Sequence, residues 1–277
     1  MLDQVVKEVD NAIDKAYGIM SQQYYIPFVL YIARADIVPG LSRYAKTDCV
    51  IDFQLDRYFD ETREQFYLRY LNRNYRKNGF KYDGESGIDD LSIEMMIYSH
   101  IWESHYFLKS LRRIAGILAN EGYLWDVEIK PIGKWDYINK YIITPLKSSC
   151  PELASIVEIA YSSDIRNAFA HSLYVIDSKS REIHIRPKRN SSIIPFEEFQ
   201  KKFLYSAILM NHMQNALEIN HIAAARKNTA LTETFQTPDG VSVQVKACTK
   251  IINGTEFPKY YLDRVIPAAS IDEDRIQ

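Results

Sequence analysis

An arginine, an amide and a histidine lie close together in the segment 164–172, whose sequence is DIRNAFAHS. Four residues separate Arg166 from His171, and in a helix Asn167 and His171 are i,i+4 neighbours, so the amide can touch and orient the imidazole. Arginine stays charged and matches phosphate oxygens with a fork of donors. Histidine titrates near neutral pH and transfers protons. The segment therefore carries groups that can bind a phosphodiester and move a proton beside it.

These groups suit cleavage of RNA by attack of its own 2′-hydroxyl on the neighbouring phosphate. That reaction needs a base, an acid and stabilisation of the phosphorane charge. His171 can serve as base or acid, and Arg166 can bind the phosphate. One histidine does not readily play both parts in one step, so we expect a dimer with two copies of the motif. Ala168 and Ala170 are small enough to let two motif helices approach closely.

The motif needs a helix that buries one face. At ~100° per residue, the arc expected to face the core carries Ile165, Phe169, Ser172 and Leu173. The opposite arc carries Asp164, Asn167 and His171. Arg166 lies to one side of that polar arc, and the small Ala170 leaves a shallow gap there.

Hydrophobic periodicity predicts a mainly α fold, an antiparallel helical bundle. The predicted helices cover 2–35 with a break near Ser21, 56–78, 89–120, 135–146 limited by Pro145, 151 to the motif, and a long helix opened by Pro195. A β-hairpin is predicted near 173–177 and 182–186, and a small β appendage over 230–265. We divide the chain into an N-terminal helical region (1–80), a helical domain (81–228) and a β-rich C-terminal appendage (229–277).

Glu103 lies in the predicted 89–120 helix within the apolar sequence WESHYFL. A carboxylate there needs a partner if it is buried. We expect that partner to be Arg166. A structural alternative has Arg166 bridging to Glu158 on the preceding helix instead.

Two basic segments could carry RNA. The first is the C-terminal half of the 56–78 helix, where Arg69, Arg73, Arg76 and Lys77 lie among tyrosines at 67, 70 and 75. Cations for phosphate and rings for bases would make a single-strand surface, whereas the alternative is a solvated helix end with its rings in the core. The second lies at the end of the hairpin and just after it, and carries Arg186, Lys188 and Arg189. There the alternative is charge that protects an edge strand from aggregation.

Composition excludes several classes of protein. The 277 residues carry a formal net charge of -2, so a nucleic-acid binder must concentrate its positive charge locally. The three cysteines are scattered with no CxxC pair, which suggests neither a zinc site nor a disulfide framework. No carboxylate cluster indicates a two-metal site, so we expect no metal and no cofactor. The acidic N-terminus is not a signal peptide and no apolar run could span a membrane, so we expect a cytoplasmic protein.

The segment from Arg166 to His171 resembles the motif of the HEPN superfamily, an arginine commonly followed by a polar residue, then a histidine after four to six intervening positions. The resemblance covers roughly residues 89–228. It implies a dimeric, metal-independent endoribonuclease, many examples of which are toxins, abortive-infection effectors or CRISPR-associated nucleases. Other members only bind RNA or nucleotides.

One toxin group of that superfamily pairs with a nucleotidyltransferase antitoxin, which modifies a tyrosine two positions after the histidine. Here Leu173 holds that position and Tyr174 comes next. We therefore keep Tyr174, with Glu103, as a supporting residue, and an antitoxin or other regulatory protein as a candidate partner.

The leading hypothesis is a dimeric endoribonuclease of a toxin or anti-phage defence system, in which Arg166, Asn167 and His171 are catalytic. The alternative is a non-catalytic module that binds RNA, a nucleotide or a protein partner through the same residues. A third hypothesis makes Arg166 purely structural.

Overall fold

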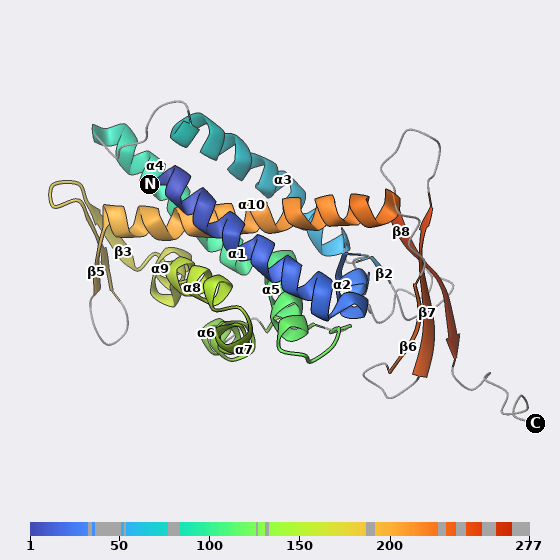
Figure 1. Ribbon diagram of the computed structural model, residues 1–277. Coiled ribbons are helices and arrows are strands. Elements are labelled where there is room, and N and C mark those ends of the chain that lie inside the picture. The colour runs from blue at the N-terminus through green and yellow to red at the C-terminus, as the bar shows by residue number, and fades with distance from the viewer. Residues whose placement is uncertain are drawn as a thin grey trace, which may run out of the picture.

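The computed structural model describes residues 1–32, 35–36, 51–52, 54–76, 84–125, 127–130, 133–186, 192–226, 231–236, 242–250 and 259–267. Over these residues the chain is mainly helical, as predicted, with small antiparallel sheets (Figure 1). The boundaries between the three predicted domains fall at 80/81 and 228/229, outside the described residues. None of the described helices is long and apolar enough to cross a membrane.

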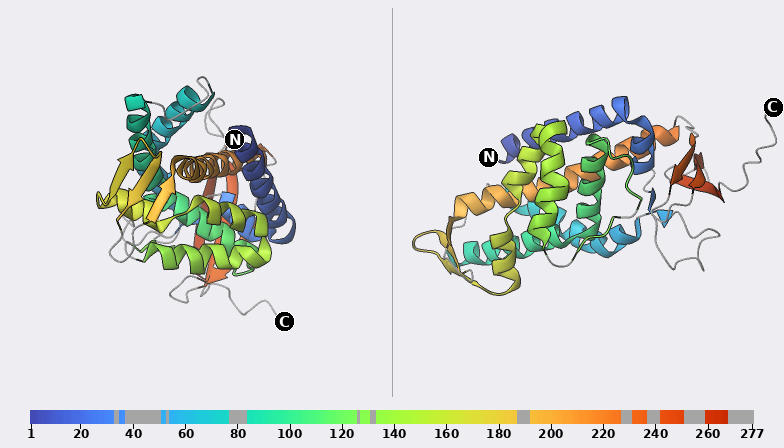
Figure 2. Two further views of the ribbon diagram at one scale, coloured as in Figure 1. Left: turned by 90° about the vertical axis from the view of Figure 1, so that its left-hand side faces the viewer. Right: turned by 90° about the horizontal axis from the view of Figure 1, so that it is seen from below.

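Helix α10 (Phe196–Arg226) runs along the length of the molecule (Figure 1). Figure 2 shows it nearly end-on, with the other helices arranged around it. Its predicted apolar face is buried, with the exception of Ile219, which is exposed. Both histidines of α10 have structural partners among the described residues: His212 pairs with Asp10, and His221 Nδ1 lies 2.8 Å from the carbonyl oxygen of Ile32.

The N-terminal helices pack against α10 and belong to the same hydrophobic core. Helix α1 (Leu2–Gln23) buries Val5, Val9 and Ala12 on one stripe, as its 3.6-residue period requires. Helix α2 (Tyr25–Ile32) begins after a break at Tyr24, three residues later than predicted. The short strands β1 (Ala35–Asp36) and β2 (Ile51–Asp52) pair antiparallel. Helix α3 (Gln54–Leu71) then continues into the π-helical turn η1 (Asn72–Arg76).

The single helix predicted over 89–120 is wrong, because the chain breaks at Ser104. Helix α4 (Gly84–Glu103) ends there and α5 (His105–Leu118) begins. Ser104 has an extended backbone, and its Oγ accepts a hydrogen bond from the Phe107 amide at 3.0 Å, an N-cap contact that competes with a continuous helix. The break makes Glu103 the last residue of α4, so its carboxylate lies at a helix end.

The helix predicted at 135–146 is longer than expected and is not limited by Pro145. It consists of α6 (Lys134–Ile138), the π-helical turn η2 (Asn139–Ile143) and α7 (Thr144–Ser149) in direct succession. Pro145 lies in the first turn of α7, directly after the π-helical turn, where its missing N–H is tolerated. Helix α8 (Pro151–Ala160) begins at a proline, as predicted.

A buried tyrosine fixes the junction between α8 and α9 (Ser163–Ala170). The Tyr98 hydroxyl donates to the carbonyl oxygen of Ala160 at 2.9 Å and accepts from the Ser162 amide at 2.7 Å. Burial raises the pKa of Tyr98, so the hydroxyl stays a donor. The Ser162 Oγ caps α9 by accepting from the Ile165 amide. The motif helix is therefore anchored at its start by α4.

Two three-stranded sheets lie at opposite ends of α10 (Figures 1 and 2). The predicted hairpin forms β3 (Tyr174–Asp177) and β4 (Glu182–Ile185), and β5 (Ser192–Pro195), which was not predicted, pairs antiparallel with β4. The predicted C-terminal β appendage contains β6 (Leu231–Gln236), β7 (Ser242–Lys250) and β8 (Lys259–Pro267) as an antiparallel meander. The first sheet comes directly after the motif helix and therefore borders the candidate site.

Candidate functional site

Helix α9 is shorter than the predicted motif helix and ends just before the histidine. Ile165 is buried as expected, but Ser172 and Leu173 are exposed, so their place on a buried arc is wrong. The reason is a left-handed turn: Ser172 has φ of 53°, and the Leu173 amide donates back to the Ala168 carbonyl oxygen at 2.8 Å. This turn fixes His171 at the helix end with an exposed side chain.

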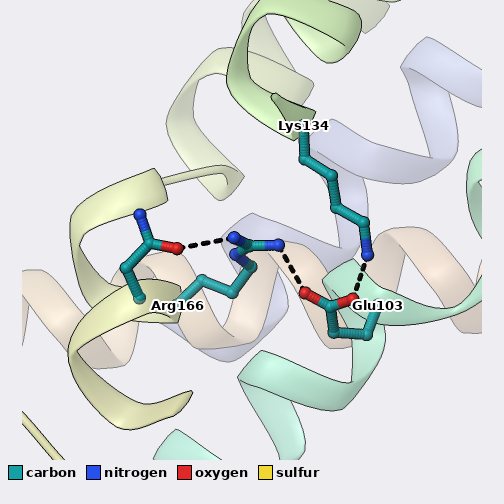
Figure 3. A network of polar contacts seen from close by, with 4 residues as sticks. Glu103, Lys134 and Arg166 are labelled. Carbon is teal, nitrogen blue, oxygen red and sulfur yellow. Dashed lines mark hydrogen bonds and ion pairs between the residues drawn. The ribbon is translucent and has the colours of Figure 1, made fainter. Parts of the chain in front are cut away.

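The guanidinium of Arg166 is held from two sides (Figure 3). Its Nη1 donates to the Glu103 carboxylate, which confirms the predicted pairing, and its Nη2 donates to Asn167 Oδ1 at 2.5 Å. The Arg166 Nε is buried, with no hydrogen-bond partner among the described residues. Glu158, the other candidate partner, pairs with Lys147 at 2.6 Å. Both terminal nitrogens of Arg166 are thus engaged within one protomer.

Lys134 completes this network, and sequence reasoning missed it. Its Nζ contacts the second oxygen of the Glu103 carboxylate (Figure 3). The side chain of Lys134 is only 3% exposed, against 16% for Arg166 and 46% for Glu103. A buried ammonium needs a counter-ion, but nothing in the sequence indicates that the first residue of α6 lies against the last residue of α4. We call Lys134, Glu103, Arg166 and Asn167 the Arg166 network.

An exposed aromatic ring borders the Arg166 network. Trp135, next to Lys134, stacks on Tyr161 with ring centroids 5.9 Å apart and planes 13° apart. Burial raises the pKa of Tyr161 to about 12, and of the nearby charges Arg166 lowers it while Glu103 raises it. Trp135 itself is 49% exposed. Because Tyr161 is buried, Trp135 alone presents an apolar ring surface beside the network, and this ring pair was also absent from the sequence prediction.

His171 opens onto a cavity of about 320 Å³, which we call the motif cavity. It is lined by Asp164, Asn167, Ala168, His171, Leu173, Ile185 and Arg186. Among the described residues no hydrogen-bond partner is found for the His171 imidazole. Arg186, at the end of β4, brings a cation to this cavity, and its amide donates to the Leu173 carbonyl oxygen at 2.9 Å. The histidine and one predicted RNA-binding arginine therefore share one cavity.

The predicted contact between the Asn167 amide and the His171 imidazole is wrong. The Asn167 side-chain oxygen accepts from Arg166, and the i,i+4 contact to His171 runs through the backbone, from the His171 amide to the Asn167 carbonyl oxygen at 3.0 Å. A charged guanidinium is a stronger donor than an imidazole N–H, which explains the choice. Asn167 nevertheless lines the motif cavity, so it belongs both to the Arg166 network and to the lining of that cavity. Arg166 does not line the motif cavity, and His171 makes none of the contacts of the Arg166 network.

Two other residues of the motif region, Tyr174 and Ala168, pack against other parts of the same chain. Tyr174, predicted as a supporting residue, is partly buried and stacks on Phe169 with ring centroids 6.0 Å apart. Ala168, expected at a contact between two motif helices, is only 2% exposed and packs in the core of its own protomer. Ala170 is exposed and remains available to a partner.

The first basic segment is split between surface and core. Arg69 and Arg73 are exposed, Arg76 ends η1, and Lys77 lies outside the described residues. Tyr67 and Tyr70 are buried, and Tyr75 donates to Glu94 at 2.5 Å. Tyr67 and Tyr70 belong to the core and Tyr75 packs against it, so the three rings do not form an exposed surface for bases. In the second segment Lys188 and Arg189 lie outside the described residues.

Comparisons of the chain with known protein families, with curated proteins and with solved structures find no match.

Proposed function

We propose that this protein is a metal-independent endoribonuclease that acts as a dimer. The observation that carries the proposal is the exposed His171 imidazole at the mouth of a cavity that also holds the guanidinium-bearing Arg186 and the amide of Asn167. An unpartnered imidazole in a cavity is free to accept or donate a proton. Arginine beside it suits a phosphate oxygen, because its donors match phosphate geometry. The resemblance of the segment from Arg166 to His171 to the HEPN motif supports the same function.

In the proposed reaction His171 acts as base or acid on the 2′-hydroxyl or the leaving oxygen. Arg186 and Arg166 stabilise the charge that develops on the phosphorane. A phosphate that takes the Arg166 donor now bound to Glu103 must replace that carboxylate, and Glu103 is the more exposed of the two residues in the ion pair. The Arg166 network therefore positions the arginine in the absence of RNA. When RNA binds, its phosphate displaces the Glu103 carboxylate from the guanidinium.

An exposed apolar strip beside the motif supports the dimer. Val175 on β3 and Ile193 on β5 both pair with His184 in the sheet register, so they lie in one row across the sheet. They are 66% and 54% exposed, and Leu173 at the mouth of the motif cavity is also exposed. Apolar side chains gathered in this way are typical of an interaction surface. A second copy docked there would bring its own histidine close to the first.

A non-catalytic module that binds RNA is the second candidate, and one observation favours it. Both terminal nitrogens of Arg166 already have acceptors within the chain, so other side chains occupy two of its donors. In such a module His171 and Arg186 would bind phosphate, and no product would form.

Cleavage of RNA in EDTA by the purified protein separates the two candidates. We expect wild-type protein to cut RNA, and the His171→Ala variant to lose about 10²–10⁴-fold in rate, the usual contribution of one acid or base. The His171 side chain is exposed, so the variant should keep its melting temperature, and it should still bind RNA. Binding by both proteins without product would favour the non-catalytic module. Equal cleavage by both proteins would refute the assignment of His171.

A further inference from the structure

A second cavity lies away from His171, between α5, the segment that precedes α6, and the helix formed by α6 and η2. Its volume is about 510 Å³, within the range of small-molecule sites. It shares no lining residue with the motif cavity. We call it the tyrosine cavity, because Tyr137 and Tyr141 line it one helical turn apart.

Aromatic rings and cations meet in the tyrosine cavity. The Tyr137 and Tyr141 rings are 5.3 Å apart between centroids, and Tyr141 is exposed. The Arg112 guanidinium carbon lies 5.5 Å from the Tyr141 centroid, and Lys140 Nζ lies 5.0 Å from it. Cations over a ring hold it in place, and part of the Tyr141 ring remains accessible to a flat ligand because the residue is 39% exposed.

The tyrosine cavity has cationic side chains that are available to an anion. Arg112, Lys130 and Lys140 line it, against the two carboxylates of Glu128 and Asp136. Arg112 Nη2 is paired with Glu121 at 2.6 Å, while its Nη1 is buried without a hydrogen-bond partner among the described residues. Lys130 and Lys140 are exposed, so both ammonium groups can turn toward a ligand. Two exposed cations at the rim and flat rings inside match a molecule that carries both a phosphate and an aromatic ring.

The hydroxyl of Tyr137 adds a hydrogen-bond donor. Burial raises the pKa of Tyr137 to about 12, which keeps its hydroxyl protonated near neutral pH. A protonated phenol donates to a ring nitrogen or a carbonyl oxygen of a base. The cavity thus offers a ring surface, a neutral donor and cations, the three kinds of contact that a nucleotide uses.

We propose that the tyrosine cavity is a nucleotide-binding site, with the base against Tyr137 and Tyr141 and the phosphate at Lys130 and Lys140. The nucleotide is either a free mononucleotide or one unit of an RNA strand, since both present a base and a phosphate. The site stands independently of the proposed nuclease. It is one residue away from the Arg166 network, because Gly133 lines the cavity and Lys134 contacts Glu103.

The test measures binding to full-length His171→Ala protein, which removes cleavage from the experiment. Equilibrium dialysis with AMP, GMP, CMP and UMP probes the free nucleotide, inorganic phosphate alone probes the anion, and a short RNA oligonucleotide probes the strand. Each binding measurement is repeated with two double variants, in which the His171→Ala protein also carries Tyr141→Ala or Tyr141→Phe. The Tyr141→Phe substitution keeps the ring. Trp135→Ala is the matched control, since Trp135 is a comparably accessible ring on the same helix but does not line the cavity. Thermal melting checks that every variant is folded.

We expect at least one mononucleotide or the oligonucleotide to bind, and Tyr141→Ala to weaken that binding about tenfold, in the range of one base–aromatic contact. In the mononucleotide experiments, the variants with Tyr141→Phe or Trp135→Ala should bind the ligand within about twofold of the His171→Ala parent. Binding of a mononucleotide identifies a free ligand, and binding of the oligonucleotide alone identifies an RNA strand. If Tyr141→Ala binds as tightly as the parent, or if no probe binds, the nucleotide site is refuted. Nucleotide binding together with no cleavage of RNA by the wild-type protein would refute only the proposed function.

Discussion

The two sides of helix α9 differ in how much of their side-chain chemistry is already used. On one side Arg166 is bound by Glu103 and Asn167, and Lys134 is buried behind that carboxylate. On the other side His171 is exposed beside a cavity, with Arg186 as the nearby cation. The arginine is positioned with both terminal nitrogens engaged, whereas the histidine side chain is exposed and has no group that orients it among the described residues.

This difference explains what a single protomer lacks. A cation whose two terminal nitrogens already hold other side chains binds a phosphate less readily, and an unoriented imidazole is an inefficient base. A second protomer or the RNA itself can supply both missing parts. We therefore expect substitutions in the exposed strip of Val175 and Ile193 to affect assembly and cleavage, and substitution of Arg166 to affect stability.

Breaking the proposed dimer should give the largest effect. Val175→Asp with Ile193→Asp introduces charges into the exposed apolar strip, where a dimer interface would have to bury them without partners. We expect a monomer in sedimentation velocity and a loss of at least about 100-fold in cleavage rate, because the second acid–base group is removed. Ile219→Asp is the control, since Ile219 is equally exposed on α10. A double variant that cleaves RNA normally would show that the strip is not needed.

Stability should separate the two sides of α9. Arg166→Ala removes one cation from Glu103, and we expect the free energy of unfolding to fall by roughly 1–3 kcal/mol, between the values for exposed and buried pairs. His171→Ala should change it by less than about 0.5 kcal/mol, as for other exposed side chains. Urea denaturation measures both. If the two variants lose equal free energy of unfolding, His171 makes stabilising contacts comparable to those of Arg166, which would contradict the difference between the two residues.

Lys134→Met tests how the network controls Arg166. Methionine keeps the buried aliphatic stem but removes the ammonium, so Glu103 is left to Arg166 alone and holds it more tightly. We expect RNA affinity to fall about threefold, because the carboxylate is less neutralised and competes better with phosphate. Lys147→Met, at an exposed pair with Glu158, should leave affinity unchanged. Unchanged affinity in both variants would separate Lys134 from RNA binding.

The smallest expected effect concerns the two basic segments. Arg186→Ala should lower the salt dependence of RNA binding by about 0.7 in the slope of log K against log salt, the value for one contact to single-stranded phosphate. Arg69→Ala should change it less, because the tyrosines beside Arg69 are in the core. Fluorescence anisotropy at several salt concentrations gives both slopes. A larger change for Arg69 would move the RNA to the α3 surface.

Much of the fold is determined by local patterns in the sequence. The buried stripe of α10, the proline start of α8 and the β3–β4 hairpin were predicted, because each depends on periodicity or turn chemistry within a short segment. The break at Ser104 was not, since a serine inside an apolar helical pattern reveals its capping role only when the flanking helices diverge.

The candidate site was predicted only where one strong rule applied. A carboxylate within an apolar helix needs a cation, and that rule led from Glu103 to Arg166. No local rule leads to Lys134 or Trp135, because α6 meets α4 and Tyr161, at the end of α8, only through tertiary packing. The Asn167 contact was predicted from helical spacing alone, which leaves out competition by a neighbouring guanidinium.

The chemical nature of the cleavage products tests the proposed reaction most directly. A defined RNA incubated with wild-type protein in EDTA should yield a 2′,3′-cyclic phosphate and a 5′-hydroxyl, because the 2′-hydroxyl attacks its own phosphate. The same RNA with a single 2′-deoxy sugar at the cleavage position should survive at that position. Products with a 3′-hydroxyl and a 5′-phosphate, or cutting at the 2′-deoxy position, would contradict the role proposed for His171.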